Sequence, residues 1–139
     1  MAAIVIDASV ASAWCFPDEQ TDYTRAVLEA AASSSVDTVA PRLWAYEIRN
    51  SVLMGLRRGR IGRPDCEQFL VSLGELNVRL IEPASYDAVF SLAQEHGLTI
   101  YDAAYLSVAL QERLPLASLD RQLVRAAEAA GVELFRAAR

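Results

Sequence analysis

The run Ala3-Ile4-Val5-Ile6-Asp7 is apolar throughout and ends at a carboxylate. The apolar residues do not alternate with polar ones, so both faces of the predicted strand are covered, which is typical of a central strand in a mostly parallel sheet. Residues 8–14 suit a helix, and Asp7 therefore lies at or just before a helix start. Ligands of open α/β sheets bind beyond the carboxyl ends of the strands, which makes Asp7 the first candidate for a functional site.

The rest of the chain alternates between strand and helix patterns. Pro64 favours a helix start, Ser85 and Thr99 are suited to cap helices, and Gly97 and Gly131 are suited to end them. We expect further strands at residues 36–40, 78–81, 116–118 and 132–135, and helices at 21–32, 42–59, 64–76, 85–96, 99–113 and 120–130. This alternation predicts an α/β sandwich with a mostly parallel central sheet of about five short strands.

The length and composition favour one globular domain over residues 1–139. The chain is 53% hydrophobic with mixed charge, which excludes a disordered protein, and no apolar run is long enough to cross a membrane. No basic segment precedes the first apolar run, which is too short for a signal peptide, so we expect a cytoplasmic protein. Cys15 and Cys66 are then expected to be free thiols.

Charge limits the chemistry available to the protein. The net charge of −5 argues against a surface coated for nucleic acid, although a local basic stripe remains compatible with it. All 13 basic residues are Arg. The absence of Lys excludes Walker A loops, Schiff-base chemistry and receiver-type phosphate acceptors.

Three acids fall at equivalent places in this topology. Asp7 and Asp120 each follow the carboxyl end of a predicted strand, and Asp102 lies in the first turn of the helix that begins near Thr99. Each has a purely structural alternative, because Asp is a preferred N-cap residue and Thr99-x-x-Asp102 is a capping-box pattern.

Glu47 lies inside a predicted helix, where neither a cap nor a terminal dipole favours it. Asn50 and Ser51, three and four positions on, are not bases, so no helical ion pair explains Glu47 either. It borders the apolar stripe of its helix, which consists of Trp44, Ile48, Val52 and Leu56. The alternative is an ordinary solvated glutamate.

Four converging acids would need a cation, because carboxylates a few ångströms apart raise one another's pKa. Oxygen ligands without a Cys or His cluster select Mg²⁺ or Mn²⁺ over Zn²⁺. Such an ion can lower the pKa of a bound water and neutralise charge on a phosphoryl oxygen, which is what phosphodiester hydrolysis requires. His96, the single histidine, precedes Gly97 at a helix end and is not expected to be a ligand.

Four segments in this order resemble a known family. They are Ile4-Val5-Ile6-Asp7-Ala8-Ser9, Glu47-Ile48-Arg49-Asn50, Leu98-Thr99-Ile100-Tyr101-Asp102-Ala103-Ala104-Tyr105-Leu106, and Leu116-Ala117-Ser118-Leu119-Asp120-Arg121-Gln122-Leu123. Together they look like the PIN-domain ribonucleases, specifically the VapC-type toxins of bacterial toxin–antitoxin pairs. The resemblance covers nearly the whole chain and implies a PIN-like three-layer α/β/α sandwich.

The resemblance implies a Mg²⁺- or Mn²⁺-dependent endoribonuclease that hydrolyses RNA with metal-activated water. The implied catalytic residues and metal ligands are Asp7, Glu47, Asp102 and Asp120. Ser9, Asn50 and Ser118 occupy positions that in similar proteins support the acids or touch phosphate. Thr often stands two residues before the fourth acid in the family; Ser118 stands there in this chain and keeps the hydroxyl. Family members like this one form homodimers, and a cognate VapB-type antitoxin inhibits them by laying a peptide across the groove.

Two further groups of residues suggest contacts with partners. Four arginines surround the breakers Gly59 and Gly62 and could grip RNA phosphates, with a solvated basic turn as the alternative: Arg57, Arg58, Arg60 and Arg63. Four apolar residues spread wider than one core stripe and suggest either a protein partner or ordinary core packing: Trp44, Tyr46, Leu53 and Leu56. The second functional hypothesis is therefore a catalytically inactive PIN-like module that acts through protein binding.

Overall fold

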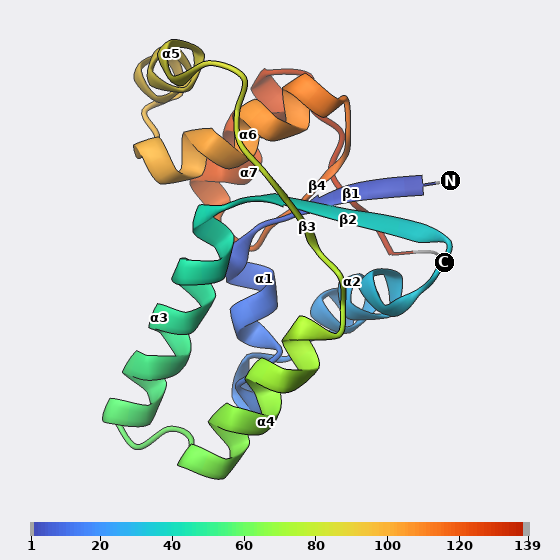
Figure 1. Cartoon of the computed structure of the whole chain (residues 1–139). Helices are drawn as coiled ribbons and strands as arrows, with labels where there is room; N and C mark the ends of the chain where they lie inside the picture. Colours follow the sequence, from blue (N-terminus) through green and yellow to red (C-terminus); the bar gives the residue numbers. More distant parts are fainter. Residues whose placement is uncertain (1, 138–139) are drawn as a thin grey trace.

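A parallel sheet of four short strands lies between two layers of helices in the computed structural model, which describes residues 2–137 (Figure 1). The strands are β1 (Ala2–Ile6), β2 (Val36–Pro41), β3 (Arg79–Ile81) and β4 (Leu116–Ala117), in the spatial order β3-β2-β1-β4. The predicted α/β sandwich is confirmed, and β1 is an internal strand as its unbroken apolar run indicated.

The two helical layers are unequal. Below the sheet in Figure 1 lie α1 (Ala8–Ala13), α2 (Asp22–Ala32), α3 (Leu43–Arg57) and α4 (Arg63–Gly74), with the short 3-10 helix η1 (Pro17–Glu19). Above it lie α5 (Tyr86–His96), α6 (Ile100–Glu112) and α7 (Arg121–Ala129). The Ser85 and Thr99 hydroxyls cap α5 and α6 as predicted, and Gly97 ends α5 with a φ of 64° in the left-handed region.

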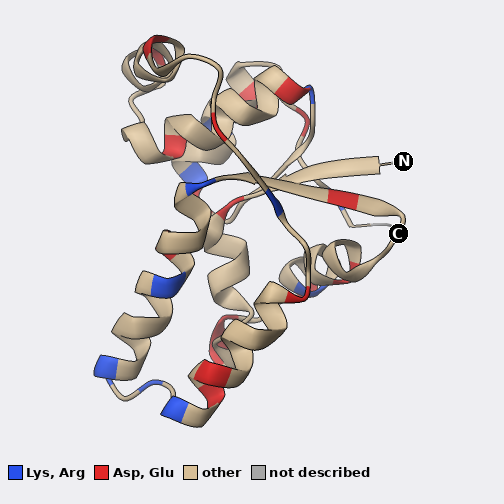
Figure 2. Ribbon diagram, in the orientation of Figure 1, with Lys and Arg blue, Asp and Glu red and all other residues tan. Residues whose placement is uncertain are grey.

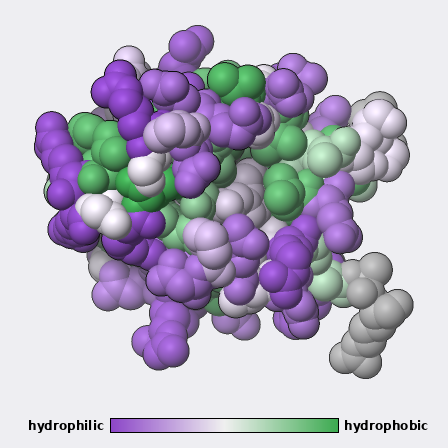
Figure 3. Space-filling model, turned by 90° about the horizontal axis from the view of Figure 1, so that it is seen from below, coloured by the Kyte–Doolittle hydropathy of each residue, from purple (hydrophilic) through white to green (hydrophobic). Residues whose placement is uncertain are grey.

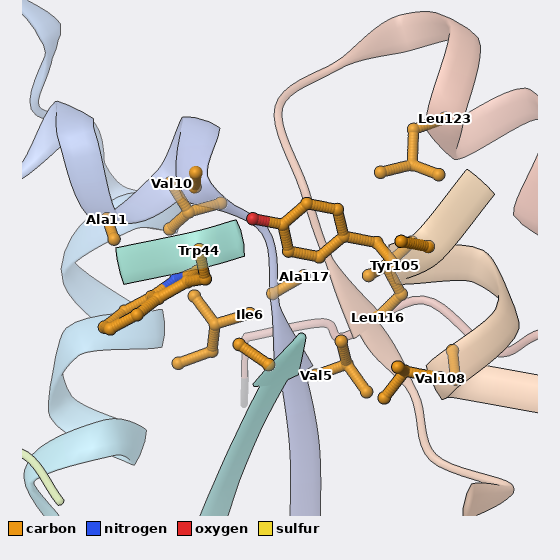
Figure 4. Packing of buried hydrophobic residues seen from close by; sticks show 14 of the residues in the cluster. Val5, Ile6, Val10, Ala11, Trp44, Tyr105, Val108, Leu116, Ala117 and Leu123 are labelled. Carbon is orange, nitrogen blue, oxygen red and sulfur yellow. The ribbon is translucent and has the colours of Figure 1, made fainter. Parts of the chain in front are cut away.

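The core is continuous from the sheet into both helical layers. Figure 4 shows Val5 and Ile6 of β1 between Trp44 on one side and Tyr105 on the other. Val5, Ile6 and Tyr105 have no exposed surface, and Trp44 is 4% exposed. Helix α6, which carries Tyr105, is buried along most of its length, so the position of its first turn is fixed by the core.

The direction in which successive strands are added to the sheet reverses at β1. The chain adds β2 and β3 on one side of β1 and then returns to place β4 on the other side. Val5 pairs with Leu116 and Ile6 with Ala117, so Asp7 and Ser118 both follow immediately beyond the paired ends of these strands. Ligand sites of open α/β sheets form at such a switch point, where the two neighbouring crossovers leave a crevice between them.

The expected fifth strand at residues 132–135 is not formed. Within residues 2–137, the sheet has four strands, and the last segment makes an isolated bridge between Leu134 and Leu116. The reason is the length of its neighbour: β4 has two residues and offers little backbone for a ladder. Cys15 and Cys66 are buried free thiols, as expected. No helix in the described part of the chain could span a membrane.

Candidate active site

Four carboxylates from separate parts of the chain line one cleft of about 510 Å³ at the switch point of the sheet. They are the four predicted acids, Asp7, Glu47, Asp102 and Asp120. Residues of α1, η1 and α3 complete the wall: Ala8, Ser9, Ser12, Glu19, Asn50, Ser51 and, from the turn after β4, Leu119. We call this hollow the acid cleft. The fold brings all four acids to this cleft, as predicted.

Asp7 is the most buried of the four, at 4% exposed. It stands at the N-cap position of α1, but its side chain makes no capping bond, so the structural alternative does not account for its carboxylate. Instead the Ser9 hydroxyl donates to Asp7 Oδ2 at 2.6 Å and the Ser118 hydroxyl donates to the same oxygen at 2.7 Å. Two donors on one oxygen fix the carboxylate and leave Oδ1 for other ligands.

The Asp7 network extends to the loop after β4. Leu119 N–H donates to Ser9 Oγ at 2.9 Å, and Asp120 N–H donates to Ser118 Oγ at 3.0 Å. Asp120 in turn caps α7, because its Oδ1 accepts the Leu123 N–H at 3.0 Å. Capping therefore holds one Asp120 oxygen, and the residue still lines the acid cleft. The support that the resemblance implied for Ser9 and Ser118 matches these hydrogen bonds.

Asp102 and Glu47 approach from opposite helical layers. Asp102 lies in the first turn of α6, where its N–H donates to the Thr99 hydroxyl at 3.1 Å. Glu47 is half-buried on α3, and its Oε1 accepts a bond from the Tyr105 hydroxyl of α6 at 2.7 Å. Asn50, one turn after Glu47, lines the same cleft.

The acids perturb one another electrostatically. Burial raises the pKa of Asp7, and the charge of Asp120 raises it further against the lowering effect of its two hydroxyl donors. Burial also raises the pKa of Glu47, with the charges of Asp7 and Asp102 adding to it. For Asp102, burial first and then the charges of Asp120 and Asp7 raise the pKa to about 6. These shifts all favour a bound cation, which would relieve both the repulsion and the desolvation.

The donor set fits a hard divalent cation. All four candidate ligands are carboxylate oxygens, which Mg²⁺ and Mn²⁺ prefer. Between residues 2 and 137, however, no three His, Cys, Asp or Glu side chains are gathered into a ready-made metal cluster. Mg²⁺ commonly binds one or two carboxylates and keeps waters and substrate phosphate as its other ligands, so the four acids need not all contact one ion.

The arginines predicted for RNA binding lie at the far end of α3, in the loop to α4 and at the first residue of α4, where Figure 2 shows basic and acidic segments side by side. Arg60 is held by Asp18 and Glu19 at 3.1 and 2.8 Å. Arg63 pairs with Glu67 at 3.1 Å within α4. Two of the four guanidiniums are thus engaged inside the molecule. Arg57 and Arg58 are exposed and remain the candidates for phosphate contacts.

Sequence reasoning missed several residues of the site. Glu19 lines the acid cleft with its charge paired to Arg60, and no motif marked it. Ser12 and Ser51 also line the cleft, each one helical turn or so from a predicted residue, and that spacing could have indicated them. Tyr105 lies in an apolar helical run, and its contact with Glu47 is what distinguishes it from a core aromatic.

The fold and this acid cleft define a class of protein. The family model of the PIN domain matches residues 4–129, and the chain therefore belongs to the PIN domain family. Its resemblance to VapC-type proteins is also confirmed. Ribonuclease VapC3 of Pyrobaculum aerophilum is 35% identical over 125 residues, which are 86% of this chain and 91% of that protein. Exonuclease VapC9 of the same organism is 33% identical over 82 residues, covering 59% of this chain and 61% of that protein.

Solved structures show the same fold. The crystal structure of PAE2754 from Pyrobaculum aerophilum has a TM-score of 0.68 and 26% identity, over 90% of this chain and 86% of that one. FitAcB from Neisseria gonorrhoeae has a TM-score of 0.62 and 21% identity, over 96% of both chains. The expected PIN-like three-layer architecture is confirmed.

Proposed function

We propose that this protein is a Mg²⁺- or Mn²⁺-dependent endoribonuclease toxin of the VapC type, neutralised by a VapB-type antitoxin. The observation that carries the proposal is the meeting of Asp7, Glu47, Asp102 and Asp120 in one cleft. A module that acted only through protein binding would gain nothing from gathering four mutually repelling acids, because their repulsion costs stability. The relatedness to Ribonuclease VapC3 supports the same substrate class.

Each cleft residue has a role in this proposal. The four acids are the residues that would hold a divalent cation in the cleft. A bound cation would supply an acidified water as nucleophile and neutralise charge on the phosphoryl oxygen. Ser9 and Ser118 orient Asp7 and oppose the rise of its pKa caused by burial, since hydrogen bonds to the charged form favour it. Asn50 lines the same cleft, and we assign its side-chain amide to contact with an RNA phosphate.

Protein partners are part of the proposal. Large hydrophobic side chains are exposed on α3, α5 and α6, among them Tyr46 at 79%, Tyr86 at 76%, Phe90 at 61% and Tyr101 at 63%. Figure 3 shows that hydrophobic side chains also reach the surface on the face seen from below, bordered by hydrophilic ones. Exposed apolar patches mark interaction surfaces, and a homodimer and an antitoxin peptide are the two expected occupants.

The activity test uses the purified chain with one linear and one circular RNA. We expect Mn²⁺ or Mg²⁺ to support cleavage of both substrates, because an endonuclease needs no free end. Excess EDTA should abolish cleavage. Asp7→Asn should lower the rate by more than about 100-fold, beyond the loss typical of residues that only support a ligand. Asp37→Asn is the matched control, because Asp37 is exposed at the opposite, amino-terminal end of β2.

The outcomes separate the hypotheses. Cleavage of the linear RNA alone would indicate an exonuclease, the activity named for VapC9. Cleavage that persists in EDTA would refute the metal mechanism. No cleavage under any condition, by a chain whose melting temperature still rises with Mn²⁺, would favour the inactive binding module.

A further inference from the structure

Tyr105 occupies a place where a phenylalanine would satisfy packing. Its side chain has no exposed surface and lies among apolar residues of β1, β4 and α7, such as Val5, Ala117 and Leu123 (Figure 4). A hydroxyl in such surroundings costs free energy unless it is hydrogen-bonded. Figure 4 shows the hydroxyl directed away from α6, toward the side of α1 and α3. Its partner there is Glu47 Oε1, at 2.7 Å.

The Tyr105 hydroxyl is the hydrogen-bond partner that holds the Glu47 side chain. Asp7 is held by two serine hydroxyls, and Asp120 is held by its cap of α7. Glu47 has a longer side chain, and its helix supplies no base three or four positions on. The bond from Tyr105 crosses from α6 to α3, over 58 residues of sequence.

Helix α6, which carries Tyr105, also positions Asp102. Residues three positions apart lie on one face of a helix, so Asp102 and Tyr105 face the cleft side of α6 one turn apart. Asp102 reaches the cleft directly, whereas Tyr105 reaches it through the Glu47 carboxylate. One buried helix therefore fixes two of the four acids relative to each other.

We propose that Tyr105 is a positioning residue for Glu47: its hydroxyl holds Oε1 and leaves Oε2 as the oxygen that a divalent cation can bind. The inference rests on the proposed metal-dependent function. It assigns to a core tyrosine the task that Ser9 and Ser118 perform for Asp7. Groups that orient a metal ligand typically contribute a factor of about 10 to 100 in metal affinity.

The test measures Mn²⁺ binding by isothermal titration calorimetry without RNA. Tyr105→Phe keeps the ring and removes the hydroxyl, and we expect its Mn²⁺ affinity to fall about 10-fold. Tyr101→Phe is the matched control, because Tyr101 is 63% exposed on the same helix, and its affinity should equal that of the wild type. Unchanged affinity of Tyr105→Phe would overturn the inference and leave the proposed function standing. No Mn²⁺ binding by the wild type would overturn both.

A double-mutant cycle shows whether Tyr105 acts through Glu47. In the Glu47→Gln background, Tyr105→Phe should cause less than about a 2-fold further change in Mn²⁺ affinity, because the two residues form one interaction. If the bond between Tyr105 and Glu47 only stabilised the fold, Tyr105→Phe would lower the melting temperature of the metal-free protein and leave its Mn²⁺ affinity intact. An equal loss of affinity in both backgrounds would also refute positioning through Glu47.

A second measurement needs no change at Tyr105. The chain has five tyrosines, each of which can be labelled with ¹³C at Cζ. The Tyr105 resonance is identified by its protection from a soluble relaxation agent, because this residue is 0% exposed. Adding Mg²⁺ should shift this resonance in the wild type and leave it unmoved in Glu47→Gln. A Tyr105 signal insensitive to saturating Mg²⁺ in the wild type would contradict the proposal.

Discussion

Replacing Asp102 by Asn should stabilise the metal-free protein. Burial and the charges of Asp120 and Asp7 raise the pKa of Asp102 from 3.8 to about 6. At about 1.4 kcal/mol per pKa unit, ionising it in the folded state costs at most about 3 kcal/mol. Because the side chain is partly exposed, solvent screening reduces this to roughly 1 to 2 kcal/mol. The asparagine carries no charge and avoids that cost.

The size of this stabilisation depends on pH. Above pH 6 the folded protein carries the ionised Asp102 and its full cost, so the variant gains most there. As the pH falls through 6 toward 3.8, the folded wild type takes up a proton before the unfolded chain does, and the gain disappears. The wild type itself should therefore become more stable between pH 7.5 and pH 5, as far as this residue contributes.

The assay is thermal unfolding in EDTA and in millimolar Mn²⁺. At pH 7.5 in EDTA, we expect Asp102→Asn to melt about 3 to 8 °C above the wild type. Mn²⁺ should raise the melting temperature of the wild type by mass action and that of the variant by less. Asp37→Asn serves as the control for loss of a negative charge far from the cleft. A variant no more stable than the wild type at pH 7.5 would refute the shared electrostatic site. A gain over the wild type that is as large at pH 4 as at pH 7.5 would refute it too.

The remaining predictions concern supporting residues. Ser118→Ala should lower the free energy of unfolding by about 1 to 3 kcal/mol in chemical denaturation, because it removes a donor to Asp7 and an acceptor from Asp120 N–H, whereas Ser118→Thr should retain most of the stability. An alanine variant as stable as the wild type would contradict this network. Gly55→Ala should cost about 1 to 3 kcal/mol, since an added Cβ would lie 2.5 Å from the Phe16 ring; a neutral result would show that the ring moves freely. Arg58→Ala should weaken RNA binding in fluorescence anisotropy and flatten its salt dependence by about one phosphate contact, and an unchanged slope would exclude the contact.

The sequence predicts the helices and the meeting of the acids well because these depend on local signals and on strand order. Ser85, Thr99 and Asp120 each cap the helix that follows, as side-chain oxygens at those places should. Asp7 and Asp120 follow parallel strands, and parallel strands bring their carboxyl ends to one edge. The fifth strand failed because pairing depends on the partner, and nothing local to residues 132–135 reveals that β4 has only two residues.

Long-range polar contacts cannot be predicted from local sequence signals or strand order. The Tyr105 hydroxyl and the Glu47 carboxylate are 58 residues apart, and an aromatic residue in an apolar helical run is indistinguishable from ordinary core packing. The pairing of Arg60 with Asp18 and Glu19 is equally hidden, since a basic turn between breakers carries no sign of its distant partners. In both cases the sequence shows the residue itself, and only the structure shows which distant residue it contacts.

The acid cleft draws its parts from both ends of the chain: Asp7 lies in the first tenth of the sequence, and the hydroxyl bound to it belongs to Ser118, 111 positions later. During synthesis, the nascent polypeptide therefore exposes its first carboxylate long before the last one is translated. A product truncated ahead of residue 118 lacks β4's following turn and with it Asp120. Fragments that end before residue 118 should therefore lack a complete acid cleft.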